Sequence, residues 1–198
     1  MQMKNSGRRS NTERTRETRA TLVKAARKLF VDKGYAETST PEIVRAAGIT
    51  RGALYHHFTD KQDLFRAVVE AEFAAVAEEI GKAAISQDKT AIDMLVAGSC
   101  IFLDCMLDRG RVRLMLLDGP AVLGADEIGQ LDMQTTSREL QVGLSHAMDA
   151  GEFRKLPLDA LTSQLSAMFD RAALRISEGE SREDHLRIFE AVFKALQA

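Results

Sequence analysis

Apolar residues recur at helical spacing along most of the chain, and no strand-like alternation competes with them. The clearest stripe lies between residues 12 and 33, where the apolar positions follow the spacing of one helix face. Its members are Leu22, Ala25, Ala26, Leu29 and Phe30. Gly34 comes next, and glycine suits the left-handed conformation in which many helices end. These residues predict a long first helix in an all-α protein.

Further helical segments follow between glycines, prolines and capping residues. The amino-terminal part should hold helices at about 41–47, 50–58 and 61–84 after the first. The remainder divides into five segments at about 89–108, 111–118, 125–150, 158–178 and 182–197. The expected breaks are at Gly110, Gly119, Pro120, Gly151, Pro157 and Gly179. The pattern therefore predicts about nine helices.

Residues 38–60 predict two short helices joined by a tight turn. Thr40 can cap the first helix, with Pro41 at the first helical position, where no N–H is needed. Gly48 can end this helix in the left-handed conformation. A helix, a glycine-containing turn and a second helix make the pattern of a helix-turn-helix DNA-binding motif.

The second helix of this pair has its own signals. Thr50 can cap its start, and Leu54 and Phe58, four residues apart, can be buried together. Thr59 or Asp60 can cap the helix that follows. The second helix is therefore expected to be held by one apolar face, which leaves its other face for solvent or for DNA.

That other face combines small residues with hydrogen-bond donors and rings. Its members are Arg51, Gly52, Ala53, Tyr55, His56 and His57. Arg51 can contact a guanine edge bidentately, and Ala53 can touch a thymine methyl group. Tyr55, Thr40 and Lys61 are residue types found on phosphates. An ordinary solvated helix is the alternative interpretation of these residues taken alone.

The same region resembles the TetR family of bacterial transcriptional regulators over roughly residues 15–70. The residues that carry the resemblance are Leu29, Phe30, Gly34, Tyr35, Thr38, Ile43, Ala47, Gly48, Ile49, Gly52, Leu54, Tyr55, His56, His57, Phe58, Lys61 and Leu64. The resemblance implies phosphate contacts from Thr40, Thr50, Tyr55 and Lys61. It implies base-facing positions for Arg51, Gly52, Ala53 and His56. Pro41 departs from the family pattern and should alter a groove contact rather than the fold.

The charge is unevenly distributed. Residues 1–60 hold 12 Lys and Arg against 6 Asp and Glu, a net charge of +6, and the remaining residues hold 15 against 23, a net charge of −8. A basic amino-terminal part on an acidic body suits a protein that approaches DNA in one orientation. Residues 1–11 are polar and are expected to be a disordered basic arm, which either reaches a minor groove or has no role.

Several other classes of protein are disfavoured. No apolar run is long enough to span a membrane and the first residues lack the pattern of a signal peptide, so we expect a cytoplasmic protein. Cys100 and Cys105 are five residues apart on one helix and are expected to be free thiols. No nucleophile–base set, phosphate loop or metal-ligand spacing is present. We therefore expect neither an enzyme nor a cofactor or metal.

The domain boundaries follow from these elements. Residues 12–60 should form the DNA-binding domain and 61–198 the effector-binding and dimerisation domain, with 61–84 as the connecting helix. Residues 116–124 look like a loop found in one subgroup of the family. Candidate effector-binding residues are spread over the methionine-rich helices of the second domain: Phe102, Met106, Met133, His146, Met168 and Arg171. Each of them can equally be an ordinary core or surface residue.

The last two predicted helices have wide apolar faces. One is marked by Leu161, Leu165, Met168, Ala172 and Ile176, and the other by Leu186, Phe189, Val192, Phe193 and Leu196. Such faces suggest burial beyond the chain's own body. The resemblance implies a homodimer through these two helices, on a near-palindromic operator in double-stranded DNA.

The expected function is a repressor released by an unidentified small molecule. The alternative is an adaptor of the same fold that acts through protein–protein contacts without an effector.

Overall fold

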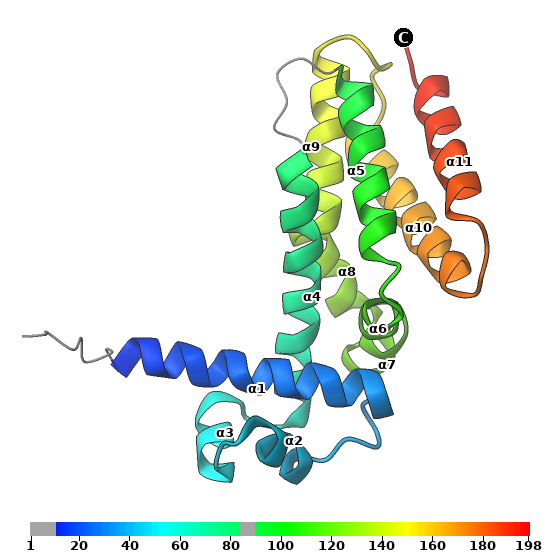
Figure 1. Ribbon diagram of the computed structural model, residues 1–198. Coiled ribbons are helices and arrows are strands. Elements are labelled where there is room, and N and C mark those ends of the chain that lie inside the picture. Colours follow the sequence, from blue (N-terminus) through cyan, green and yellow to red (C-terminus); the bar gives the residue numbers. More distant parts are fainter. Residues whose placement is uncertain (1–10, 84–89) are drawn as a thin grey trace, which may run out of the picture. The chain divides into compact units, whose positions relative to one another are not determined.

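The computed structural model describes residues 11–83 and 90–198, and this part of the chain consists of helices joined by short connections (Figure 1). The helices are α1 (Asn11–Lys33), α2 (Thr40–Ala47), α3 (Arg51–His57), α4 (Lys61–Ala83), α5 (Ala91–Cys105), α6 (Arg109–Val112), the π-helix η1 (Arg113–Asp118), α7 (Gly119–Leu123), α8 (Ala125–Gln134), α9 (Thr136–Asp149), α10 (Leu158–Ser177) and α11 (Arg182–Ala195). The all-α prediction is confirmed. The first ten residues of the expected basic arm lie outside the described residues.

The chain forms two compact units, one that ends at Val68 and one that begins at Val69. We call them the head and the body. The predicted boundary at residue 60 lies earlier, because the first two turns of α4 belong to the head. Leu64, Phe65 and Val68 on those turns are almost fully buried. α4 therefore carries core residues of the head at its start and residues of the body at its end.

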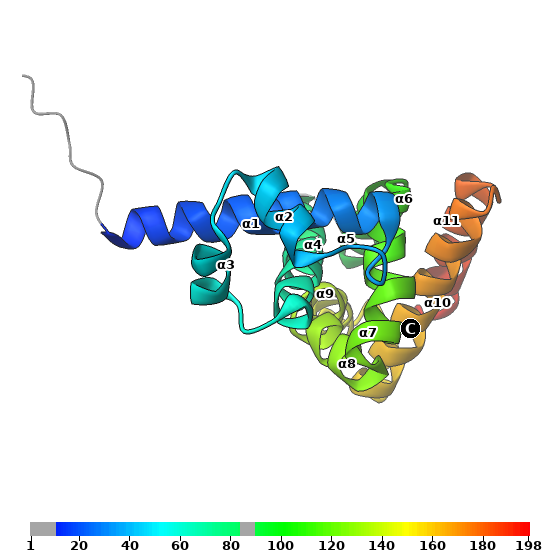
Figure 2. The same cartoon turned by 90° about the horizontal axis from the view of Figure 1, so that it is seen from below.

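The head is built on α1, with α2 and α3 packed against it. Figure 2 shows this part from below, where α2 crosses α1 and α3 lies beside it. The core consists of the fully buried side chains Leu22, Ala26, Phe30, Ile43, Leu54, Leu64 and Phe65. The Phe30 and Phe65 rings meet edge to face with centroids 5.1 Å apart, and Tyr35 closes the cluster at 5.0 Å from Phe65. The first predicted stripe thus packs as the pattern indicates.

The body is a bundle in which α5 contacts α9, α10 and α11, and α10 also contacts α9. In Figure 1, α5, α9 and the end of α4 run alongside one another. Polar contacts tie the ends of these helices together. The Glu152 carboxylate accepts hydrogen bonds from the backbone N–H groups of Ala91 and Ile92, at 3.0 and 3.3 Å, and so caps α5. Arg182 forms an ion pair of 2.6 Å with Asp104 of α5.

The helical path does not break at Gly119 and Pro120, contrary to the prediction. Residues 113–118 widen into a π-helix, and α7 continues directly from it with the proline in its first turn. In a regular α-helix, proline would leave the carbonyl one turn earlier without a donor, and its ring would clash with that carbonyl. A wider π-turn before the proline relieves both problems. Residues 116–124, expected as a loop, are therefore helical up to Leu123.

The predicted helix 125–150 is divided at Thr135 into α8 and α9. Thr135 has φ −130° and ψ −98°, and its hydroxyl donates to the Leu131 carbonyl. The hydroxyls of Thr136 and Ser137 donate instead to the carboxylate of Asp132. Ser and Thr hydroxyls that bond locally compete with the helix, and three in a row interrupt it. The two corrections raise the number of helical elements above the nine expected.

Gly119 offers a test of this arrangement. A Cβ atom at this position would lie 2.7 Å from the Leu114 carbonyl oxygen and 3.0 Å from Cδ1 of Ile128. Because backbone cannot yield cheaply, we expect Gly119→Ala to lower the free energy of unfolding by about 1–3 kcal/mol. Gly129→Ala is the matched control, since a Cβ there meets nothing within 4 Å and should raise stability by up to about 1 kcal/mol. Urea unfolding of both variants measures the difference, and equal stabilities would contradict the close approach.

Candidate nucleic-acid interface and ligand cavity

The start of α2 is capped by Ser39, one residue earlier than predicted. The Ser39 backbone N–H and hydroxyl both donate to the Glu42 carboxylate, at 3.0 and 2.8 Å. Lys33 at the end of α1 adds an ion pair of 2.5 Å to the same carboxylate. The hydrogen bonds from Lys33 and then Ser39 lower the pKa of Glu42 to about 2. Thr40 is therefore a helical residue, and its side chain is not needed as the cap.

α3 is held by the two residues that its pattern singles out. Leu54 is fully buried and Phe58 is 2% exposed. The Thr50 hydroxyl accepts the N–H of Ala53 at 3.2 Å, which confirms the predicted cap. The guanidinium carbon of Arg19 on α1 lies 5.2 Å from the centroid of the Phe58 ring. These contacts fix α3 on the head, so its other face has a defined direction.

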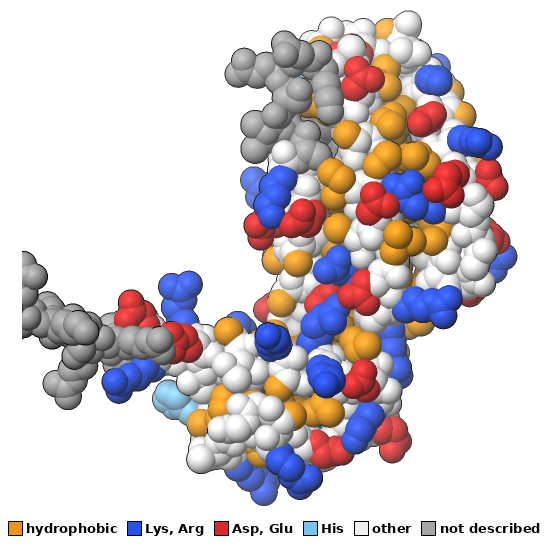
Figure 3. Space-filling model, viewed as in Figure 1, with side chains coloured by type: hydrophobic (Ala, Val, Ile, Leu, Met, Phe, Trp, Pro, Cys, Tyr) orange, Lys and Arg blue, Asp and Glu red, His pale blue; other side chains and the backbone are white. Residues whose placement is uncertain are grey.

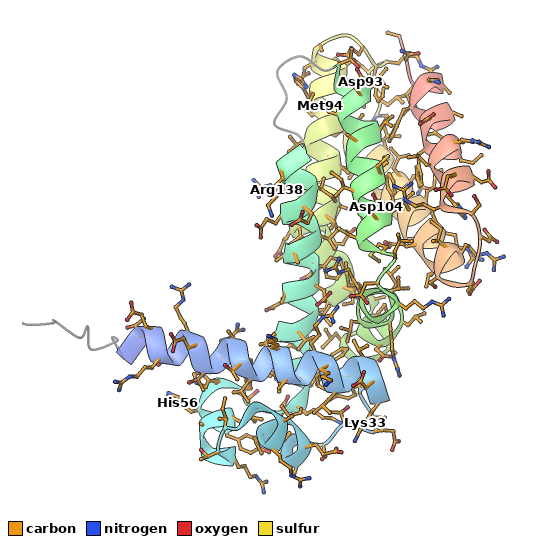
Figure 4. The ribbon with its side chains drawn as sticks, in the orientation of Figure 1. Lys33, His56, Asp93, Met94, Asp104 and Arg138 are labelled. Carbon is orange, nitrogen blue, oxygen red and sulfur yellow. The ribbon has the colours of Figure 1, made fainter. Side chains whose placement is uncertain are left out.

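The outer face of α3 is exposed. Arg51, Gly52, Tyr55 and His56 are exposed, and Ala53 and His57 are half-buried. Figure 4 labels His56 where it projects from the end of α3, and Figure 3 shows Lys and Arg side chains at the outer edge of the head. The six predicted residues thus share one helix, with no member in the core. Burial, followed by the charges of His56 and Arg19, lowers the pKa of His57.

Tyr55 is organised by its neighbours. Hydrogen bonds from the side chains of Thr40 and then Arg51 lower the pKa of its phenol. The guanidinium carbon of Arg51 lies 5.5 Å from the centroid of the Tyr55 ring. Residues of α2 and α3 are therefore joined at one place on the head surface, where a phenol, a hydroxyl and a guanidinium lie together.

Lys61 lies differently from the simple phosphate contact that the sequence suggests. Its ammonium group donates to the carbonyl oxygens of Tyr35 at 2.9 Å and Thr38 at 3.0 Å. It also lies 4.2 Å from the centroid of the Tyr35 ring. Two of its three donors thus hold the loop between α1 and α2 against the start of α4. Sequence reasoning missed this structural role, because the contact spans more than twenty residues of chain.

The body contains a cavity of about 440 Å³. Its walls come from α4, α5, α8, α9 and α10. They are formed by Ile80, Met94, Leu95, Gly98, Ser99, Phe102, Asp132, Thr136, Ser137, Glu139, Leu140, Val142, Gly143, His146, Ser166, Phe169 and Asp170. Figure 4 labels Met94 on α5. A volume of this size is typical of sites for small organic molecules.

Two of the six candidate ligand residues, Phe102 and His146, line this cavity. The other four lie elsewhere. Met106 is in the core without lining the cavity, and Met133, Met168 and Arg171 are exposed on the outside of α8 and α10. Helical periodicity alone does not place Arg171, which is one residue beyond the wall residue Asp170. Neighbouring positions on a helix point in different directions.

Most of the polar wall was missed at the level of sequence. The Asp132 carboxylate accepts hydrogen bonds from the hydroxyls of Thr136, Ser137 and Ser166, the last two at 2.5 and 2.8 Å. The signal that could have found it is the run of three hydroxyl residues that begins three positions after an aspartate, in the middle of an otherwise continuous helical pattern. That run breaks the helix and brings the hydroxyls to the carboxylate.

Asp170, one turn beyond Ser166 on α10, lies at the same end of the cavity. Burial and then the negative charge of Asp132 raise its pKa to about 7. In contrast to Asp132, Asp170 accepts no hydrogen bond from the described residues. The cavity therefore joins one carboxylate with three hydroxyl donors to a second carboxyl group that is close to half protonated at neutral pH.

Asp170→Asn should change how stability depends on pH. A carboxyl pKa raised in the folded state stabilises the fold below the ordinary pKa, and this stability is lost as pH rises through about 7. Between about pH 6 and pH 8 the free energy of unfolding should fall by about 1.4 kcal/mol more in the natural protein than in the variant. Urea unfolding at both pH values measures this. Asp126→Asn, an exposed carboxyl on α8, is the control, and parallel behaviour of D170N and the natural protein would contradict the raised pKa.

The comparisons with known proteins agree with this arrangement. Residues 22–68 match the family described as bacterial regulatory proteins, tetR family, and residues 92–198 match the tetracyclin repressor-like C-terminal domain. The HTH-type transcriptional repressor AcnR of Corynebacterium glutamicum is 27% identical over 177 residues, 88% of this chain and 90% of that protein.

Solved structures extend the match to the fold of both units. A TetR-family transcriptional regulator from Pectobacterium atrosepticum has a TM-score of 0.73 at 30% identity, covering 96% of this chain and 98% of that one. RolR in complex with resorcinol has a TM-score of 0.71 at 21% identity, covering 95% and 91%. No helix in the described part of the chain is long and apolar enough to cross a membrane. Regulators of this kind are not enzymes. The chain belongs to the TetR family of bacterial transcriptional regulators and is a DNA-binding protein.

Proposed function

We propose that this regulator is a repressor that leaves a near-palindromic operator when a small molecule occupies the cavity of the body. The observation that carries the proposal is the pairing of an exposed, firmly anchored α3 with a cavity of about 440 Å³ in the other unit of the same chain. The first is suited to DNA, and the second is suited to a small organic molecule.

The proposed DNA contacts differ from residue to residue on this surface of the head. Arg51 projects from the first turn of α3, where a guanidinium can contact a guanine edge bidentately. Gly52 and Ala53 leave room for the close approach of a base pair, and His56 continues the same face. Tyr55, Thr40, Thr50 and His57 are assigned to the phosphates at the edges of the groove. Lys61 keeps one donor for a phosphate while it holds the head together.

The link between the two sites runs through α4. Leu64 and Phe65 on its first turns are core residues of the head, whereas Ile80 on its last turns lines the cavity. In the body, Glu72 on α4 forms an ion pair of 2.9 Å with Arg111 on α6, and only 7% of the Glu72 side chain is exposed. A ligand that moves the end of α4 would have to strain or break the ion pair between Glu72 and Arg111. By linkage it must bind the DNA-free form better, with a coupling of typically about 1–3 kcal/mol.

A homodimer through α10 and α11 completes the proposal, because two recognition helices are needed for a palindrome. Several residues of the predicted apolar faces are used within the chain, since Leu165, Ala172, Phe189 and Phe193 are buried. Large apolar side chains that remain exposed on these helices include Met168 and Ile188. Small exposed residues accompany them and allow close helix packing: Ala160, Ser163, Ala167, Ala191 and Ala195.

An adaptor that needs no effector is the competing function. It would use the same head and a partner protein on the body surface. The cavity favours the effector, because protein interiors are normally packed without voids of this size. RolR, a protein with the same fold, carries resorcinol in its structure, which adds support from a distant relative.

Two substitutions on α3 separate base contacts from phosphate contacts. Arg51→Ala should relax the preference at one or two base pairs of an operator selected from random DNA, by about 1–3 kcal/mol. Tyr55→Phe should weaken binding to all duplexes alike, since it removes only the hydroxyl. Fluorescence anisotropy on the operator and its single-base variants measures both, with Arg138→Ala on α9 as the control for loss of one positive charge. An equal loss on every duplex for R51A would exclude base reading by Arg51.

The dimer interface is tested separately by a charge on its exposed apolar surface. The Ile188 side chain is 56% exposed on α11, so Ile188→Asp should leave each chain folded and convert the dimer to monomers in sedimentation velocity. Leu117→Asp is the matched control, because Leu117 is 53% exposed and belongs to η1 rather than to α10 or α11. A dimer that survives I188D unchanged would place the interface elsewhere.

A further inference from the structure

Acidic side chains dominate the described part of the cavity wall. Asp132, Glu139 and Asp170 belong to it, and no lysine or arginine does among the described residues. His146 is the basic residue in this described part. Among these residues an anionic guest would meet carboxylates without a guanidinium or ammonium to pair with. The wall therefore favours a guest that brings positive charge or hydrogen-bond donors.

The Asp132 carboxylate is held in place by hydrogen bonds. Three hydroxyls from α9 and α10 donate to it. These donors also fix its position, because they come from two different helices. A carboxylate can accept about four hydrogen bonds, so an ordered acceptor remains available for one more donor.

Asp170 differs from Asp132: it is a carboxyl group in the same wall whose ionised form is disfavoured by burial, and no described residue donates a hydrogen bond to it. It lies one helical turn after Ser166, which holds Asp132, so the two acidic groups share one end of the cavity. Their mutual repulsion is relieved by a cation placed near both of them. A neutral guest would leave this repulsion in place.

The rest of the wall is apolar and partly aromatic. The Phe102 and Phe169 rings pack edge to face with centroids 5.4 Å apart, and Phe189 stacks behind Phe169 at 3.9 Å. Met94 and Leu95 of α5 add adaptable apolar surface. Aromatic faces attract cations as well as apolar groups, so this wall and the acidic end suit one and the same molecule.

We propose that the cavity binds an organic amine in its protonated form, with an apolar part about the size of an aromatic ring. Its ammonium group lies between Asp132 and Asp170. This inference rests on the proposed role of the cavity as the effector site and specifies its ligand class. Phe102 and Phe169 contact the apolar body, and the hydroxyls around Asp132 keep the first carboxylate in place.

A head-group series on one body tests the proposal. The purified full chain is titrated by isothermal calorimetry with 4-phenylbutylamine, 4-phenylbutanol and 4-phenylbutanoate, which differ only in the charged or polar end. We expect the amine to bind about tenfold or more tightly than the alcohol, and the carboxylate to bind weakest. Equal affinities for amine and alcohol, or preference for the carboxylate, would overturn the proposal.

Variants assign the effect to the two acidic groups. Asp170→Asn and Asp132→Asn should each remove most of the preference for the amine over the alcohol, while the alcohol affinity changes little. Asp126→Asn, on the same helix as Asp132 but exposed and outside the cavity, should keep it. If D132N disturbs folding, because three hydroxyls lose their acceptor, D170N alone decides the matter. An unchanged amine preference in D170N contradicts the ammonium position.

The operator affinity of the same protein separates this inference from the function on which it rests. Amine binding that depends on Asp170 but leaves the operator affinity unchanged supports the ligand class and contradicts release by the cavity. Release of the operator by the alcohol as readily as by the amine supports the effector cavity and contradicts the ligand class. The two claims can thus fail independently.

Discussion

The burial of Leu54 and Phe58 is the constraint on which the DNA-reading face depends. A helix of seven residues is far too short to persist alone in water, because nucleation is unfavourable and few hydrogen bonds follow it. α3 exists because these two side chains lie in the head core and because Thr50 caps its start. Its exposed face is consequently fixed as firmly as the core beneath it. Thr40 and Arg51 then orient Tyr55 from outside that core.

In the body, the acidic end of the cavity depends on a break in a helix. A continuous helix from 125 to 150 would have kept Thr136 and Ser137 in line with α8. The break at Thr135 brings their hydroxyls back to the carboxylate of Asp132 and makes the acidic end of the cavity. Irregular helix geometry also marks η1 and α7 nearby. The acidic end of the cavity thus lies where regular helix geometry is interrupted.

Much of the fold could be predicted from the sequence, because helix stripes, caps and glycine stops are local. The stripe of α1, the burial of Leu54 and Phe58 and the cap at Thr50 follow from residues within one or two turns of each other. The errors have equally local causes. Pro120 was expected to stop a helix, but the π-turn before it absorbs the proline, and the hydroxyl run after Asp132 was not recognised as a break.

The two candidate sites also differ in how far the sequence could predict them. The outer face of α3 could be predicted because it is what remains of a short helix once the core positions are removed. The cavity could not, since its wall joins five helices and depends on which side of each helix faces inward. Lys61 shows the same limit: its residue type suits a phosphate, yet its bonds to Tyr35 and Thr38 cross a long stretch of chain.

The role of α3 in reading DNA is tested by selecting bound DNA from a random duplex pool with the purified full chain at near-physiological salt. We expect enrichment of a near-palindrome whose half-sites are about one helical turn apart or a little more, as two copies of α3 in a two-fold dimer require. If no sequence is enriched and binding vanishes as salt rises, the DNA-reading role of α3 is contradicted, since only nonspecific attraction to phosphates behaves in that way.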